Sequence, residues 1–436
     1  MRPDAMSDRS AAVRVADPTA PFPGAPSPPA VSVSRVTQGL PGEGALWLWA
    51  VDRLARQLRR GRLTLVGPDG RARRYVGAEP GPEAEVVLRS PVAARRLLLG
   101  GAVGFGTGYV DGLWDTPDRT AVLSLALAND DRVSIAGLGS ALGRLSHLLR
   151  HRRRANTRAG SRRNIAYHYD LGNAFYGAWL DPGMTYSAAL WARPEDSLEE
   201  AQANKYRQMC RDLDLRPGRH VLEIGCGWGG FAEIAAREFG ARVTGITLSR
   251  EQLAYARARM ARAGLADQVT LDLCDYRDVT GQYDAIASIE MVEAVGEAHW
   301  PAYFGTLAAR LKPGGRVALQ AITIEDARFE DYRRTPDFIQ THVFPGGMLP
   351  TKGHLRAGLA EAGLTVADER AFGLDYARTL DLWRAAFEAA WPDILASGAG
   401  FDDRFRRLWL YYLDYCKAGF AFGSIDVVQI RADRPV

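Results

Sequence analysis

Apolar residues form two different periodic patterns in the second half of the chain. From about residue 201, short apolar runs rich in β-branched residues alternate with segments in which apolar residues recur every three or four positions. The first pattern predicts buried strands and the second predicts amphipathic helices. The predicted strands span residues 220–226, 242–248, 269–275, 283–290, 315–324 and 425–434. Because strands and helices alternate, we expect an α/β fold with a doubly wound, mostly parallel sheet, and we expect the last strand to join it at an edge.

Residues 43–132 show a different mixture of patterns and predict a small α+β domain of their own. A helical segment leads into a hairpin with Pro68-Asp69-Gly70 as its turn, and a strand follows at 83–90. The next segment, 91–114, predicts a helix that passes into a glycine-rich loop. The proline-rich residues 1–42 predict a disordered tail.

Residues 133–164 predict a basic linker between the two parts. An amphipathic segment there gives way to a run that contains seven arginines: Arg150, Arg152, Arg153, Arg154, Arg158, Arg162 and Arg163. A solvated linker explains this run. A contact with anionic lipid headgroups, at about 1 kcal/mol per arginine, is the functional alternative. We expect no nucleic-acid partner, because aromatic residues that would stack on bases are not interleaved with the arginines.

Bulk composition places the chain among ordinary globular proteins. Of its 436 residues, 47% are hydrophobic and 24% charged, and the net charge is only +4. The four cysteines lie far apart without a CxxC pair, so we expect neither a metal site nor a disulfide framework, and a reducing compartment fits best. No apolar run approaches the ~20 residues of a membrane span. We therefore expect a cytoplasmic protein that touches a membrane surface without crossing it.

The stretch VLEIGCGWGG combines a strand, a glycine-rich turn and the start of a helix. Its glycines allow a tight turn and a close approach of the backbone to a ligand. The spacing of Glu223, Gly225, Gly227 and Gly229 is typical of class I methyltransferases that bind S-adenosylmethionine. A dinucleotide-binding fold would instead carry an acidic residue at the end of the second strand. The residues at that position, 247–252, provide neutral groups for ribose hydroxyls.

The stretch SIEMVEAVG places Glu290 and Glu293 among apolar residues at the exit of a predicted strand. Strand exits of α/β sheets are where ligands bind. Capping of the following helix is a role that fits Glu290 better than Glu293. A carboxylate in an apolar pocket can accept a proton or orient an anion.

Several separate stretches resemble one family in register: AYHYDLGNAFYGAWLDPGMTYSAALW, VLEIGCGWGGFAEIAA, GITLSREQLAYA, SIEMVEAVG, FIQTHVFPGGMLP, YARTLDLWRAAF and YYLDYCKAGF. They are similar to cyclopropane-fatty-acyl-phospholipid synthases and the related mycolic-acid methyltransferases. The resemblance implies that residues 165–436 form an S-adenosylmethionine-dependent catalytic domain. It also implies that residues 43–132, with GFGTGYVDGLW, form a lipid-interacting domain and that the chain forms a homodimer.

The resemblance implies a reaction on unsaturated acyl chains of phospholipids at the membrane surface. A methyl group passes from S-adenosylmethionine to a cis double bond, and loss of a proton closes a cyclopropane ring. The glycine motif and the resemblance together predict these cofactor contacts: Tyr186, Ser187, Glu223, Gly225, Gly227, Gly229, Thr247, Leu248, Ser249, Gln252, Asp275 and Tyr276.

The family also holds a bicarbonate ion as its presumed base. Its ligand positions fall on Ala188, Glu293, Gln320, Ile322 and Tyr376, which are the predicted catalytic residues. Two of these depart from the family pattern, because Ala188 stands where Cys is usual and Gln320 where several members carry His. A methylene-branched or methyl-branched product therefore stays open. Methylation of a small soluble metabolite and non-catalytic lipid binding are further alternatives.

Overall fold

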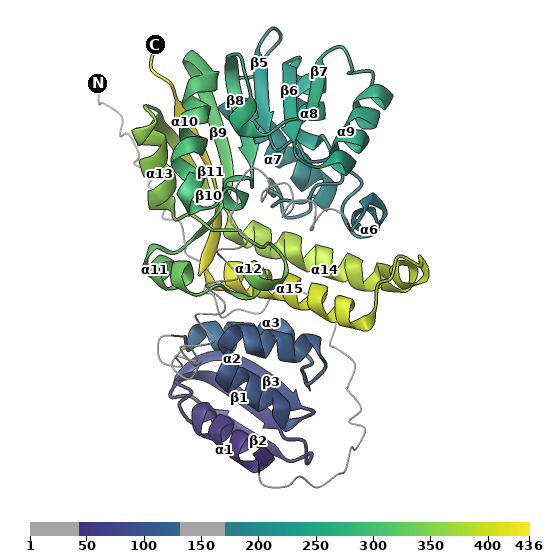
Figure 1. The fold of residues 1–436 in the computed structure, drawn as a ribbon, viewed down its shortest axis with the longest axis vertical. Coiled ribbons are helices and arrows are strands. Elements are labelled where there is room, and N and C mark those ends of the chain that lie inside the picture. Colours follow the sequence, from purple (N-terminus) through teal and green to yellow (C-terminus); the bar gives the residue numbers. More distant parts are fainter. Residues whose placement is uncertain (1–42, 131–170) are drawn as a thin grey trace, which may run out of the picture.

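A computed structural model describes residues 43–130 and 171–436 (Figure 1). A small N-terminal unit lies at one end of the molecule, a large sheet at the other, and two long helices, α14 (Gly373–Ala396) and α15 (Asp403–Phe422), lie between them (Figure 1). The predicted tail at 1–42 and the predicted linker at 133–164, with its arginine run, lie outside the described residues.

The N-terminal unit is an α+β structure with a four-stranded sheet in the order β2-β1-β3-β4. Its elements are α1 (Glu43–Ala55), β1 (Arg60–Val66), β2 (Ala72–Val76), β3 (Glu79–Leu88), α2 (Pro91–Val110), β4 (Trp114–Asp115) and α3 (Arg119–Ala128). The glycine-rich loop predicted after the first half of α2 is wrong. The helix continues to Val110 and is only broken at Gly101, whose φ of 57° is open to glycine at little cost.

The large sheet has seven strands in the order β10-β11-β9-β8-β5-β6-β7. They are β5 (His220–Ile224), β6 (Arg242–Thr247), β7 (Val269–Leu273), β8 (Tyr283–Ile289), β9 (Leu311–Ile324), β10 (Thr365–Ala371) and β11 (Ile425–Asp433). The strands from β9 to β7 are parallel, whereas β11 pairs antiparallel with both β9 and β10. The edge position predicted for the last strand is therefore wrong: β10, which the sequence analysis missed, takes the edge.

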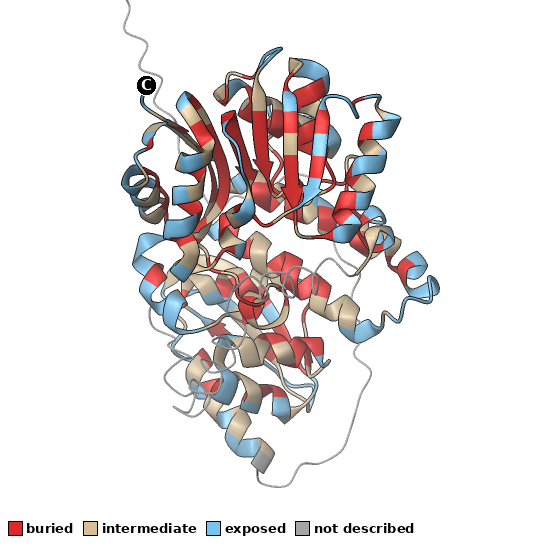
Figure 2. Cartoon of the chain, turned by 45° about the horizontal axis from the view of Figure 1, so that its top comes forward, coloured by how far each residue is buried: buried red, intermediate tan, exposed pale blue. Residues whose placement is uncertain are grey.

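Helices cover both faces of this sheet and bury its central strands (Figure 2). The covering helices are α7 (Leu198–Asp212), α8 (Gly230–Phe239), α9 (Arg250–Arg262), α10 (Trp300–Arg310) and α13 (Lys352–Glu361). The shorter helices α6 (Asn173–Gly177), α11 (Asp326–Arg334) and α12 (Phe338–His342) lie toward α14 and α15, at the end of the sheet that faces the N-terminal unit (Figure 1). In β5 and β8, Val221, Leu222 and Ile286 are fully buried, as expected for parallel strands that are covered on both faces. None of the helices in the two described ranges is long and apolar enough to cross a lipid bilayer.

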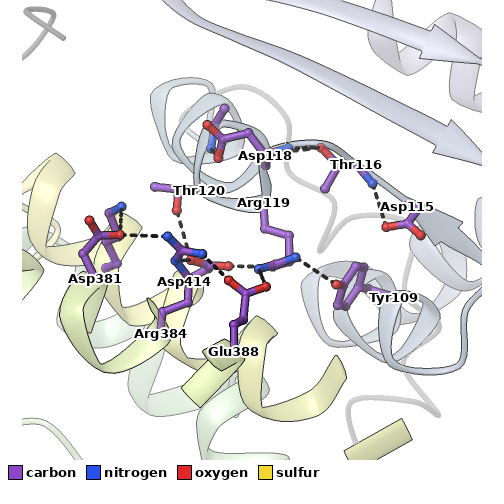
Figure 3. A network of polar contacts seen from close by, with 12 residues as sticks. Tyr109, Asp115, Thr116, Asp118, Arg119, Thr120, Asp381, Arg384, Glu388 and Asp414 are labelled. Atoms are coloured by element: carbon purple, nitrogen blue, oxygen red, sulfur yellow. Dashed lines mark hydrogen bonds and ion pairs between the residues drawn. The ribbon is translucent and has the colours of Figure 1, made fainter. Parts of the chain in front are cut away.

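A buried polar network joins the N-terminal unit to the two long helices (Figure 3). Arg119, at the start of α3, donates to the buried carboxylate of Asp414 on α15 at 2.5 Å, and Thr120 donates to the same carboxylate at 3.2 Å. Arg384 of α14 lies 3.5 Å from Asp414. Two cations and a hydroxyl therefore surround one buried carboxylate, and this arrangement fixes α3 against α14 and α15.

Candidate active site

The glycine turn after β5 leaves backbone open for a ligand. Gly225, Gly227 and Gly229 all have positive φ, at 86°, 50° and 86°. Within residues 43–130 and 171–436, a Cβ atom on Gly227 would meet no heavy atom within 4 Å, so the backbone there is open to a ligand. Glu223, in the strand before the turn, has a buried Oε2 that finds no hydrogen-bond partner in the same ranges, and burial raises the pKa of this carboxyl to about 8. An open backbone and an unpaired buried oxygen fit a polar cofactor at this turn.

The end of β6 forms the next part of the predicted cofactor site. Thr247 Oγ1 donates to Gln252 Oε1 at 2.9 Å, and both side chains are buried. Ser249 caps α9 by accepting from the Gln252 backbone N–H, and Leu248 lies half-buried between strand and helix. These four residues are therefore gathered at one strand end.

The third part of the predicted cofactor site lies after β7. The Asp275 carboxylate accepts from the Arg277 guanidinium at 2.6 and 2.8 Å and from its backbone N–H. The Tyr276 ring packs against Tyr303 in the core, with 7% of the residue exposed. The contacts of Asp275 and Tyr276 with an adenine stay a prediction.

Tyr186 and Ser187 lie beside a fully buried lysine that sequence reasoning missed. Lys205 Nζ donates to Ser187 Oγ at 2.6 Å and to Gln202 Oε1 at 2.7 Å. Burial lowers the pKa of Lys205 to about 7, although the carboxylates of Glu290, Asp181 and Glu223 oppose that shift. The sequence signal for this position was weak, since one lysine in a charged helix reads as a surface residue.

Glu290 lies at the centre of the residues predicted to bind an anion. Its Oε1 accepts from the Ala188 backbone N–H and from Gln320 Nε2, both at 2.8 Å, and its Oε2 accepts from the Tyr376 hydroxyl at 2.8 Å. Gln429 Nε2 donates to Gln320 Oε1 at 3.0 Å, which turns the Gln320 amide group toward Glu290. Three of the five predicted anion ligands therefore bind a carboxylate of the chain itself.

The helix-capping role considered for Glu290 is wrong. Glu290 directly follows β8, and its φ of 50° is rare for a residue with a side chain. The backbone N–H donates to Gln320 O at 2.7 Å, which holds this turn against β9. Such a strained conformation at a ligand-binding strand end is typical of functional residues.

Glu293 is buried as predicted, but its contacts differ from those of Glu290. Its Oε1 accepts from the Ile322 backbone N–H, while its Oε2 is buried without a partner among the described residues. Burial, reinforced by the charge of Glu290, raises the pKa of Glu293 to about 8. At neutral pH Glu293 is thus the protonated member of the pair.

Burial also raises the pKa of Glu290, but three hydrogen-bond donors and the nearby Lys205 act in the opposite direction. Two neighbouring carboxyl groups that both lie in a buried site share their protons, and the group with more donors keeps the charge. We assign the negative charge of the pair to Glu290. Ala188, Gln320 and Tyr376 donate to Glu290, and the binding of a bicarbonate ion at these residues stays a prediction.

A cavity of about 1640 Å³ opens onto this carboxylate pair. Tyr186, Glu290, Glu293, Ile322 and Tyr376 line its inner end. The glycine turn is adjacent, because a Cβ atom on Gly225 would lie 3.0 Å from the side chain of Met291, the residue after Glu290. The arrangement can hold an apolar ligand against a buried negative charge beside a cofactor turn.

Comparisons with known proteins agree with this arrangement. The family model for mycolic acid cyclopropane synthetase matches residues 156–430, which is more than half of the chain. The chain belongs to this family. The tuberculostearic acid methyltransferase UfaA1 of Mycobacterium tuberculosis is 41% identical over 375 residues, or 84% of this chain and 86% of that protein. The cyclopropane-fatty-acyl-phospholipid synthase of Escherichia coli is 36% identical over 366 residues, or 81% and 88% of the two chains.

Among solved structures, the mycolic acid cyclopropane synthase CmaA1 complexed with SAH and CTAB matches with a TM-score of 0.59 and 30% identity. The match covers 63% of this chain and 98% of that one. The predicted class I methyltransferase fold is confirmed, and so is the predicted family. The chain is thus a member of a family of S-adenosylmethionine-dependent methyltransferases that act on lipid acyl chains.

Proposed function

We propose that this chain transfers a methyl group from S-adenosylmethionine to the cis double bond of an unsaturated acyl chain in a phospholipid. The observation that carries the proposal is a buried carboxylate pair, Glu290 and Glu293, at the inner end of a large, mainly apolar cavity. The glycine turn lies next to that end.

S-adenosylmethionine supplies an activated methyl group when it is bound. The open backbone at Gly227 and the unpaired Glu223 Oε2 are suited to hold polar groups of this cofactor. Thr247 and Gln252 offer a hydroxyl and an amide at the neighbouring strand end. Lys205 Nζ donates to Ser187 Oγ, and this hydrogen bond orients the segment that carries Tyr186.

An alkene has no acidic proton to lose first, so its methylation creates a carbocation on the acyl chain. Water would trap this cation, and the apolar walls of the cavity serve to exclude it. The rings of Tyr186 and Tyr376 line the same end and can stabilise a positive charge through their faces. The negative charge of Glu290 adds electrostatic stabilisation in a site of low polarity.

In this proposal Glu290 accepts the proton that the methylated chain loses. The methyl carbon gains a bond to the chain as its bond to the sulfonium sulfur breaks, and S-adenosylhomocysteine is the leaving group. One C–H bond of the methylated chain then breaks, its electron pair neutralises the carbocation, and the proton passes to a carboxylate oxygen of Glu290. Glu290 thereby performs the role that a bound bicarbonate was expected to perform. Because the raised pKa of Glu293 favours its neutral form at pH 7, Glu290 and Glu293 together carry a charge of −1.

Two products can follow from this step. Direct bonding of the methyl carbon to the far carbon of the former double bond closes a cyclopropane ring. A hydrogen shift along the chain before the methyl group loses its proton leaves a methylene branch instead. The similarity to UfaA1, which is named for methyl transfer rather than ring closure, supports the second product.

Expression in a bacterial host without such modifications, followed by NMR of its fatty acids, tests the proposal. We expect either cyclopropane protons or exocyclic methylene protons in chains that were originally unsaturated. NMR is needed because the two products have the same mass. Fatty acids unchanged from those of the empty host, with soluble protein present, would refute the proposal.

A further inference from the structure

The cavity does not end in the catalytic part of the chain but continues into the N-terminal unit. Every major element of that unit contributes apolar side chains to the cavity wall: Leu54 of α1, Leu65 of β1, Val86 of β3, Ala94 of α2 and Leu125 of α3. These side chains belong to the hydrophobic core of the unit, and the space that they border is one continuous cavity with the part that reaches Glu290.

Such a space is unusual inside a small domain. Protein interiors are close-packed and leave few voids larger than a water molecule. A pocket for a single small ligand is about 300–1,000 Å³, whereas this cavity measures about 1640 Å³. The walls in the N-terminal unit are almost wholly apolar, so they suit a hydrocarbon chain.

Apart from Glu290 and Glu293, the charged residues of the cavity wall lie on α11 or near it. Arg328, Asp331, Arg333 and Arg334 line the cavity there. Arg328 Nη1 also donates to Asp130, at the end of the N-terminal unit, at 2.6 Å. The side chains of Arg333 and Arg334 remain 47% and 71% exposed, so this region is open to solvent. It lies where the catalytic part and the N-terminal unit meet.

We infer that the N-terminal unit holds the second acyl chain of the phospholipid. The headgroup lies at the charged region on α11, the reacting chain runs to Glu290, and the other chain enters the space between the small sheet and helices α1, α2 and α3. This inference rests on the proposed function and assigns a place to the part of the substrate that does not react. A single-chain substrate would leave the N-terminal space unused.

Filling the N-terminal space tests the inference. Ala94 lines the cavity and is 1% exposed, whereas Val92, two residues earlier on the same helix, is 43% exposed and does not line it. Ala94→Phe and the matched control Val92→Phe are compared with the unaltered full chain. The substrates are vesicles of dioleoyl phosphatidylglycerol and, separately, the single-chain 1-oleoyl lysophosphatidylglycerol. Release of S-adenosylhomocysteine gives kcat/KM for each pair.

We expect Ala94→Phe to reduce kcat/KM for the two-chain lipid by about tenfold or more, because the mismatch of a few methylene groups with a pocket has effects of that size. Activity on the single-chain lipid should stay unchanged, and Val92→Phe should alter neither. Equal activity of Ala94→Phe and the unaltered chain on the two-chain lipid would overturn the inference. An equal loss on both lipids would also overturn it, since it would mean that one chain fills the whole cavity.

Melting curves accompany every variant, and Leu97→Trp, which fills the same space from the next turn of α2, replaces Ala94→Phe if the latter does not fold. Failure of the proposed function gives a different result. In that case the unaltered chain methylates neither lipid, whereas failure of this inference leaves the unaltered chain active.

Discussion

Replacement of Glu290 by glutamine separates the charge of this side chain from its shape. In Glu290→Gln, the amide oxygen can keep the bonds from Ala188 N–H and Gln320 Nε2, and the amide nitrogen can donate to the Tyr376 hydroxyl after that hydroxyl rotates. All three contacts therefore have a neutral counterpart. The fold should tolerate the change, and only the negative charge is lost.

The magnitude follows from these contacts. Hydrogen bonds to a charged group contribute about 1.5–3 kcal/mol and neutral ones about 0.5–1.5 kcal/mol, so the three bonds weaken by about 3 kcal/mol in total. The cost of burying an ion, several kcal/mol in real proteins, disappears at the same time and offsets this loss. Stability should thus change little, whereas loss of the proton acceptor should lower kcat by about 10²–10⁴-fold.

The assay measures release of S-adenosylhomocysteine with vesicles of an unsaturated phospholipid, and calorimetry measures cofactor binding in parallel. Cofactor affinity should be unchanged. Glu361→Gln, on the exposed end of α13 away from the cavity, is the matched control and should retain full activity. A Glu290→Gln variant with kcat close to that of the unaltered chain would refute the role of Glu290 as proton acceptor.

Further predictions concern the anion, the cofactor, the pH dependence and the interface. Glu290→Gly should lose activity and regain part of it when acetate or bicarbonate is added. The unaltered chain should keep its rate in CO₂-free buffer. A loss of rate of the unaltered chain in that buffer would show that a free anion is the base. Gly227→Val should abolish S-adenosylmethionine binding in calorimetry, because a side chain would enter the free space at the turn; unimpaired binding would place the cofactor elsewhere. The pKa of Glu293 is raised from 4.5 to about 8, so its proton stabilises the folded state fully below pH 4.5, and this contribution is lost as pH rises to about 8. The melting temperature should therefore fall over that range less steeply in Glu293→Gln, and identical pH profiles would contradict this ionisation. Asp414→Ala should lower the free energy of unfolding by about 3–5 kcal/mol, because the buried Arg119 guanidinium loses the carboxylate to which it donates. Denaturant unfolding measures this free energy. A change below about 1 kcal/mol, which is typical of exposed ion pairs, would mean that the network of Figure 3 is solvated.

Much of the fold was predictable because parallel strands buried on both faces are continuous apolar runs. The strands β5 and β8 have this character, whereas β7, at the edge of the sheet, has only two buried positions, Val269 and Leu271. Strand β10 was missed because its sequence, TVADERA, has three charged residues and no buried position. Because β10 was not predicted, β11 was expected at the edge of the sheet.

The sequence predicted several residues of the candidate site, but it did not predict that Glu290 is the residue they contact. Ala188, Gln320 and Tyr376 were named from resemblance, yet they belong to separate segments, and only their packing brings them onto Glu290. A buried carboxylate at a strand end looks like a helix cap in sequence, since the hydrogen-bond donors that distinguish the two roles are distant along the chain. Lys205 was missed because a single lysine in a charged helix is typical of a surface position.

Transfer of a ¹³C-labelled methyl group tests the central claim most directly. The full chain is incubated with S-[methyl-¹³C]adenosylmethionine and vesicles of dioleoyl phosphatidylglycerol, and the extracted lipid is examined by NMR. The account predicts that the label is attached to a carbon of the former double bond, as a ring carbon or a methylene branch. Label found only in the headgroup, or no label in the lipid at all, would contradict it.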